Sequence, residues 1–143
     1  MDEVKLDEIG QWLIKASHDL GSAKCLLVGD TPYLDTAVYH CQQAAEKALK
    51  AYLTLKDTPF QKIHDLSVLV EQCMELDSTF DRLKEIPEIL NPYATAFRYP
   101  GDVLEPEAAD ADEAYELASM VFEFVVVRMP EELKKQIAKL RKL

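Results

Sequence analysis

The sequence has little glycine and no glycine-rich phosphate-binding loop. Glycine occurs only four times in 143 residues, while 48% of the residues are apolar and 29% are charged. This composition favours a helical domain over a β-sandwich or a disordered chain. The length predicts a single domain covering residues 1–143.

Cysteine is scarce, and its number is odd. Cys25, Cys41 and Cys73 are widely spaced, and each lies within a helical pattern. Such a set is not typical of a disulfide framework or a zinc site, so we expect reduced thiols in or near the core. The histidines and cysteines show no metal-ligand spacing. We predict neither a metal site nor a cofactor.

The chain lacks a signal peptide pattern and a long apolar run. Residues 1–9 have no cationic start and no apolar core. The most apolar late stretch, residues 120–129, is interrupted by Glu123 and Arg128 and is too short to cross a bilayer. We therefore expect a cytoplasmic protein that does not enter the membrane.

Basic residues are outnumbered by acidic ones, 16 to 26, which gives a formal net charge of −10. Residues 102–123 contain several acidic side chains but no lysine or arginine. Because a phosphate backbone attracts basic surfaces, this charge disfavours nucleic-acid binding by the whole surface. A local basic site or a basic protein partner remains compatible with it.

Apolar residues recur at steps of three and four, which predicts helices. We expect an all-α fold, an antiparallel up-and-down bundle of four main helices plus short extra helices. Asp65 is the expected N-cap of the third main helix, and Pro106 is expected in the first turn of the fourth. A type II turn is expected at residues 99–102. The expected helices cover residues 6–28, 33–55, 66–76, 106–128 and a basic C-terminal segment, 130–143, with short pieces between 78 and 97.

Residues 36–53 form the most informative segment. On a helix, this segment has an apolar half built mostly of small side chains and a polar half. The polar half carries a column made of Tyr39, Gln43, Glu46 and Lys50, with His40 and Lys47 beside it. In the simplest interpretation, Glu46 and Lys50 form an exposed ion pair worth a few tenths of a kcal/mol. The alternative is that the column contributes to a functional site.

Four short motifs form a recognisable set along the chain. They are ASHDL at 16–20, CQQAAEKALKA at 41–51, IHDL at 63–66 and AFRYPGD at 96–102. In that order and spacing, the chain resembles the HEPN domain family (higher eukaryotes and prokaryotes nucleotide-binding domain) over roughly residues 6–129. The resemblance implies a bundle of four main helices that is usually dimeric. In prokaryotes it also implies an association with a small nucleotidyltransferase encoded beside it, often as a toxin–antitoxin pair.

Two motifs of that family can be compared with this sequence residue by residue. An acid followed four positions later by a base is matched by Glu46 and Lys50. The signature of RNA-cleaving members, an arginine followed by a histidine, is matched only by Arg98, since no histidine follows His64. Metal-independent cleavage needs proton exchange near neutral pH, which histidine does best. Tyr99 and Asp102 lie nearby but ordinarily titrate far from pH 7.

The candidate site residues form two groups. Arg98 is the best candidate for a phosphate contact, because a guanidinium can bind phosphate through two donors. The other ligand-binding candidates are Lys50, Glu46, Lys47, Asp19 and Tyr99, and a second group comprises His64, Asp65, Gln43 and Tyr39. Asp19 could instead be a buried partner of Lys47 or Arg98. His64 could simply bond backbone in the turn before the third main helix.

Three functions remain open. The favoured one is a nucleotide- or phosphate-binding regulatory subunit that forms a homodimer and partners a small nucleotidyltransferase, with ATP or RNA as the candidate nucleotide. The second is a metal-independent ribonuclease toxin using Arg98, which the missing histidine disfavours. The third is a non-catalytic helical interaction module. An enzymatic activity is therefore less favoured than a binding role.

Overall fold

The computed structural model of the protein describes residues 1–101 and 105–141, and all regular secondary structure in those ranges is helical. This confirms the predicted all-α class. None of the described helices combines the length and the apolar character needed to cross a membrane. The elements are α1 (Glu3–Leu27), α2 (Leu34–Leu55), α3 (Leu66–Leu76), the 3-10 helix η1 (Ser78–Leu83), α4 (Ile86–Leu90), the 3-10 helix η2 (Asn91–Ala94), α5 (Ala108–Val126) and α6 (Glu131–Arg141).

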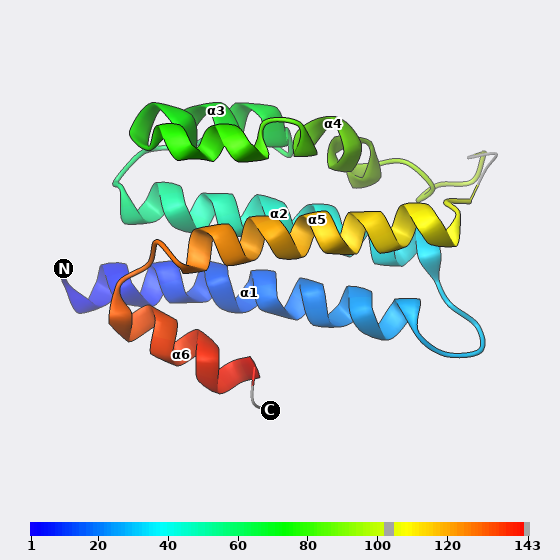
Figure 1. The fold of residues 1–143 in the computed structure, drawn as a ribbon, viewed down its shortest axis with the longest axis horizontal. Helices are drawn as coiled ribbons and strands as arrows, with labels where there is room; N and C mark the ends of the chain where they lie inside the picture. The colour runs from blue at the N-terminus through cyan, green and yellow to red at the C-terminus, as the bar shows by residue number, and fades with distance from the viewer. Residues whose placement is uncertain (102–104, 142–143) are drawn as a thin grey trace.

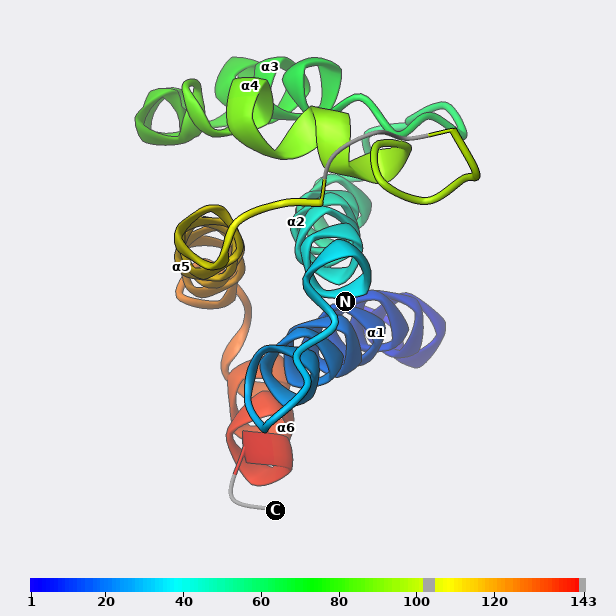
Figure 2. The same ribbon diagram turned by 90° about the vertical axis from the view of Figure 1, so that its right-hand side faces the viewer.

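The three long helices, α1, α2 and α5, pack together and carry most of the core (Figure 1). Helix α1 runs antiparallel to both α2 and α5, so the segment η1–α4–η2 returns the chain to the start of α5. Figure 2 shows α3 and α4 on one side of α2, α1 and α6 on the other side, and α5 along its flank. Helix α2 therefore packs against other helices above, below and along one flank in this view.

The small residues of α2 explain how so many elements pack around it. Ala44, Ala45 and Ala48 are fully buried, and such short side chains allow neighbouring helices to approach closely. The polar side of α2 is also covered, so that Glu46 is 3% exposed and Lys50 is 6% exposed. The prediction of an exposed Glu46–Lys50 pair is therefore wrong. Tertiary packing buries the pair, because the segment between α2 and α3 folds back over this side of the helix.

Most helix ends lie within a few residues of their predicted positions. Asp65 is the N-cap of α3, as predicted, and its carboxylate accepts a hydrogen bond from Ser67 N at 2.9 Å. The prediction that Pro106 lies in the first turn of α5 is wrong, because Glu107 is the N-cap and the helix begins at Ala108. The Asp110 carboxylate accepts from Glu107 N at 3.3 Å, which satisfies the donor at this later start.

The predicted turn at residues 99–102 is described only in part. Gly101 has a φ of 103°, the left-handed conformation that the third position of a type II turn requires. Asp102 lies outside the described residues.

The three cysteines differ in their surroundings. Cys41 and Cys73 are buried, and burial raises the pKa of each thiol to about 12, which makes them poor nucleophiles. Cys25 is exposed on α1, so the expectation that it lies in or near the core is wrong.

Candidate functional site

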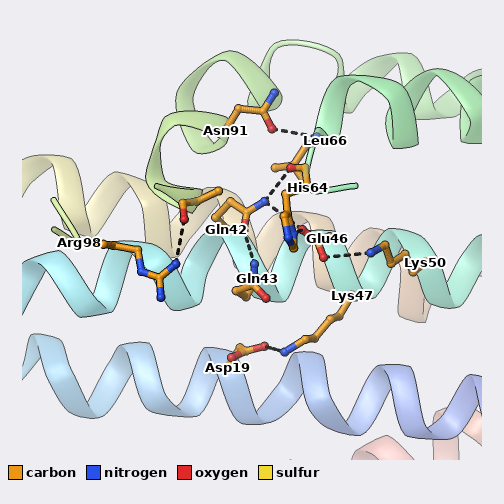
Figure 3. Close-up of polar contacts among 11 residues, drawn as sticks. Asp19, Gln42, Gln43, Glu46, Lys47, Lys50, His64, Leu66, Asn91 and Arg98 are labelled. Atoms are coloured by element: carbon orange, nitrogen blue, oxygen red, sulfur yellow. Dashed lines mark hydrogen bonds and ion pairs between the residues drawn. The ribbon is translucent and has the colours of Figure 1, made fainter. Parts of the chain in front are cut away.

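Glu46 is the centre of a polar cluster between α2 and the segment before α3 (Figure 3). Its Oε2 accepts a hydrogen bond from Lys50 Nζ at 3.0 Å, and its Oε1 lies 2.8 Å from His64 Nδ1. Gln42 Nε2 donates to the same Oε1 at 3.3 Å and to the His64 carbonyl at 3.0 Å. The local role expected of the His64 side chain is therefore wrong, because it reaches across to α2 instead of the neighbouring backbone.

Lys50 is enclosed by aromatic rings as well as by Glu46. Its Nζ lies 5.7 Å from the centre of the Trp12 ring and 5.5 Å from the centre of the Phe60 ring. The two rings meet edge to face at 5.9 Å. A buried ammonium is tolerated when a carboxylate pairs with it and ring faces surround it. The charge of Lys50 is thus neutralised within the protein.

Asp19 joins α1 to α2 through two contacts. Its Oδ2 accepts from Lys47 Nζ at 2.6 Å, and its Oδ1 accepts from His40 Nδ1 at 2.8 Å. Asp19 is only 7% exposed, so both contacts are made largely out of water. Of the two partners proposed for Asp19 from the sequence, the structure pairs it with Lys47 and not with Arg98.

Arg98 stacks on Tyr39 at the first turns of α2. The guanidinium carbon lies 3.8 Å from the centre of the Tyr39 ring, and Nη1 donates to the Ala94 carbonyl at 3.2 Å. A guanidinium has five N–H donors, and among the described residues only Ala94 accepts one of them. The two side chains line a pocket, here called the Arg98 pocket, whose lining is Asp35, Thr36, Tyr39, His40, Phe97 and Arg98.

The backbone next to Arg98 is conformationally unusual. Phe97 has a φ of 66°, in the left-handed region that bulky side chains rarely adopt. Its ring packs 6.1 Å from the ring of Tyr93, which holds the residue in place. Such conformations persist only where surrounding contacts enforce them, and they are concentrated at functional sites. The next residue, Arg98, packs on Tyr39 of α2.

His40 is a pocket residue that is not among the site residues predicted from the sequence. Its ring lines the Arg98 pocket and also a neighbouring groove between α1 and α2. Its place beside Tyr39 in the polar column was a signal available from the sequence. The Asp19 partner was not, because the packing register of α1 against α2 is a tertiary property.

The structure separates the other predicted site residues. Tyr39 and Arg98 lie together, and Tyr99 is 61% exposed with its ring 5.8 Å from the Arg98 guanidinium. The cluster around Glu46 contains Lys50, His64 and Gln43, whose Nε2 donates to Gln42 Oε1 at 2.7 Å. Figure 3 shows this cluster and Arg98 at different positions along α2. Among residues 1–101 and 105–141, no three histidine, cysteine or carboxylate side chains gather in a metal-binding arrangement.

Asp65 has a capping role, supported by Asn91 at the start of η2. Asn91 Nδ2 donates to Asp65 Oδ1 at 2.9 Å, and Asn91 Oδ1 accepts from Leu66 N at 2.8 Å. The Asn91 amide and the Ser67 backbone N–H hold the pKa of the Asp65 carboxyl below its usual range. Asp65 does not line the Arg98 pocket.

Comparison with known proteins gives a consistent result. A sequence model of the HEPN domain matches residues 9–135. The crystal structure of TT1696 from Thermus thermophilus is similar with a TM-score of 0.72 and 29% identity, over 85% of this chain and 98% of that chain. ST0689, described as an archaeal HEPN homologue, is similar with a TM-score of 0.66 and 25% identity, over 84% of this chain and 96% of that chain. No curated protein matches the chain.

Proposed function

The chain belongs to the HEPN domain family, and we propose that it is a nucleotide- or phosphate-binding regulatory subunit whose binding site is the Arg98 pocket. The observation that carries this proposal is the stacking of the Arg98 guanidinium 3.8 Å from the Tyr39 ring centre. Stacking fixes the plane of the guanidinium, and a fixed guanidinium can bind a phosphate through two parallel hydrogen bonds.

The surroundings of Arg98 also suit an anion. The pocket lies at the N-terminal end of α2, a helix of 22 residues whose dipole favours negative charge there. Thr36 contributes a hydroxyl to the lining. Among the described lining residues Asp35 is the only acid, and it accepts a hydrogen bond from Thr36 N at 2.8 Å, so part of its charge is satisfied at the helix end.

In this proposal Lys50 and Lys47 are not the phosphate ligands. Lys50 is paired with Glu46 at 3.0 Å and Lys47 with Asp19 at 2.6 Å, and neither lysine lines the Arg98 pocket. The Lys50 pair lies within α2, and the Lys47 pair joins α2 to α1. Of the three basic candidates, Arg98 is thus the one that can bind a ligand without breaking an internal ion pair.

The proposal includes a homodimer and a small nucleotidyltransferase partner. Tyr33 and Tyr99 are 59% and 61% exposed. Tyr33 comes two residues before Asp35 of the pocket, and Tyr99 directly follows Arg98. Exposed aromatic side chains are enriched at protein interfaces, so these two support a homodimer interface beside the pocket. The nucleotidyltransferase partner rests on the association typical of prokaryotic members of the family.

A metal-independent ribonuclease is the second candidate. One observation favours it: the pocket contains the imidazole of His40, the residue type that the sequence after Arg98 lacks. Cleavage requires a group that takes the proton of the 2′-hydroxyl and a group that protonates the leaving oxygen. The lining supplies one imidazole for these two tasks, so binding is the better supported function.

Calorimetric titration with ATP and with inorganic phosphate tests the proposal. We expect the wild-type protein to bind, and Arg98→Ala to weaken binding by about 1–3 kcal/mol, the scale of a lost charge-assisted hydrogen bond. A matched control replaces Lys134 and Lys135 on α6 by alanine, which should leave the affinity unchanged. Equal affinity in wild type and Arg98→Ala, or no binding by the wild type, would contradict the proposal.

A further inference from the structure

His40 is held in one orientation by groups on both sides of its ring. Its Nδ1 lies 2.8 Å from Asp19 Oδ1. An ionised carboxylate only accepts hydrogen bonds, so Nδ1 is the donor in this contact. The Tyr39 ring packs against the imidazole with its centre 5.6 Å away. Asp19 is itself fixed by Lys47 at 2.6 Å, so the carboxylate cannot turn away.

The Asp19 contact determines what the other ring nitrogen can do. In a neutral imidazole with Nδ1 protonated, Nε2 is a hydrogen-bond acceptor. No group in residues 1–101 and 105–141 makes a hydrogen bond to this atom, and the His40 side chain is 27% exposed. His40 lines the Arg98 pocket as well as the groove between α1 and α2. An acceptor that the described residues do not use is therefore available beside Arg98.

His40 Nε2 would bind a hydrogen-bond donor, whereas the Arg98 guanidinium would bind hydrogen-bond acceptors. One ligand can satisfy both residues only if it carries both kinds of group. A fully ionised nucleotide phosphate has acceptor oxygens for Arg98 but no hydrogen to donate to Nε2. A hydroxyl group elsewhere on the same ligand would supply that donor. A ribose carries a hydroxyl at its 2′ position that a deoxyribose lacks, whereas the 3′-hydroxyl is common to ATP and 2′-deoxy-ATP and cannot create a preference between them.

We propose that His40, positioned by Asp19, accepts a hydrogen bond from the ribose 2′-hydroxyl of a nucleotide whose phosphate is bound by Arg98, so that the pocket selects ribonucleotides over deoxyribonucleotides. This inference rests on the proposed phosphate binding by Arg98. The other acceptors in the described lining are the Asp35 carboxylate and the hydroxyls of Thr36 and Tyr39. Asp35 Oδ1 already accepts from Thr36 N at 2.8 Å, so its Oδ2 is the main competitor, which the Asp35→Asn variant below tests. His40 has no such competing contact at Nε2 among the described residues.

The test compares the affinities of the full-length protein for ATP and 2′-deoxy-ATP by calorimetry. The wild type should bind ATP roughly fivefold to tenfold more tightly, the range expected for one net hydrogen bond. In His40→Phe, which keeps a ring of similar shape without an acceptor, the ratio of the two affinities should fall to about one. Asp19→Asn should lower the same ratio, because its amide can donate to Nδ1 and leave Nε2 protonated.

The control is His18→Ala, which removes an exposed imidazole from the neighbouring groove outside the Arg98 pocket. It should keep the wild-type ratio. Circular dichroism melting checks that each variant is folded, and His40→Ala replaces His40→Phe if the latter does not fold.

The outcomes separate this inference from the proposed function. If ATP and 2′-deoxy-ATP bind equally well and Arg98→Ala weakens both, phosphate binding stands and the role of His40 is overturned. If the preference for ATP survives in the His40 variants but is lost in Asp35→Asn, Asp35 recognises the sugar and the inference is wrong. If the wild type binds neither nucleotide nor inorganic phosphate, both proposals fail.

Discussion

His64 Nδ1 lies 2.8 Å from Glu46 Oε1, and this contact attaches the segment before α3 to the middle of α2. The two residues are eighteen positions apart, and the intervening chain covers the polar side of α2. A helix face that is polar in sequence thereby becomes part of the interior. The lysine on that face, Lys50, depends on Glu46 for its charge partner.

Glu46→Ala should destabilise the protein by about 3–5 kcal/mol, because it leaves the Lys50 ammonium buried without a counter-charge. Glu46→Leu combined with Lys50→Met removes both charges and should cost less than Glu46→Ala. Urea denaturation measures both free energies of unfolding. A loss below about 0.5 kcal/mol for Glu46→Ala, typical of an exposed pair, would show that the ion pair is not buried in solution.

Tyr39 should affect ligand binding through its ring. Tyr39→Leu removes the surface on which Arg98 stacks and should weaken ATP binding by about 0.5–1 kcal/mol, the usual size of an exposed cation–π contact. Tyr39→Phe keeps the ring and should bind nearly as well as the wild type. Calorimetry decides between them. If the two variants lose the same affinity, the tyrosine hydroxyl matters and the stacking does not.

Purified protein should not cleave single-stranded RNA in the presence of a metal chelator. The Arg98 pocket offers one imidazole, whereas cleavage needs both a base and an acid near pH 7. Gel analysis of labelled RNA checks this expectation. Cleavage that disappears in both Arg98→Ala and His40→Ala would instead establish the ribonuclease candidate, with His40 as its proton-transfer group.

Two glycines should respond to alanine in opposite directions. Gly21 lies within α1 with open space beside it, so Gly21→Ala should stabilise the protein by about 0.5–1 kcal/mol. Gly101 also has open space but a φ of 103°, so Gly101→Ala should destabilise it by about 1 kcal/mol. Thermal melts of the two variants provide the comparison. Equal and small shifts would mean that the turn at Gly101 relaxes without cost.

The Asp65–Asn91 contact should contribute to the pH dependence of the free energy of unfolding at acid pH. Because the folded-state pKa of Asp65 lies below its unfolded value, this carboxylate stabilises the fold above about pH 4 and loses that contribution as the pH falls further. Asn91→Ala removes the main cause of the shift. It should lower the stability at pH 7 by about 1–2 kcal/mol, since Leu66 N also loses its acceptor.

Urea midpoints between pH 7 and pH 2.5 measure this effect. The wild type should lose more stability over that range than Asn91→Ala does. The Asp65→Ser variant keeps a capping oxygen without an ionisable group and should resemble Asn91→Ala in its pH dependence. Parallel pH profiles for wild type and both variants would contradict the proposed role of the Asn91 amide.

The sequence indicates several residues of the candidate site, but it does not indicate which of them lie together. Arg98 was indicated by its match to the arginine of the HEPN signature and by its side-chain chemistry, and Tyr39 by its place in the polar column of α2. Their stacking at 3.8 Å depends on where the turn after η2 meets α2. The left-handed backbone of Phe97, which precedes Arg98, has no sequence signal of the kind that a glycine supplies.

The sequence by itself determined the helices, the cap at Asp65 and the small-residue face of α2. These features depend on contacts between residues a few positions apart, and a periodic pattern records such contacts directly. Only the tertiary structure decided that Glu46 and Lys50 are buried, that Asp19 orients His40, and that His40 shares a pocket with Arg98. Those relationships depend on the register of α1 against α2 and on the return of the chain over the polar side of α2. Packing of the whole core sets both, and no local pattern in the sequence specifies them.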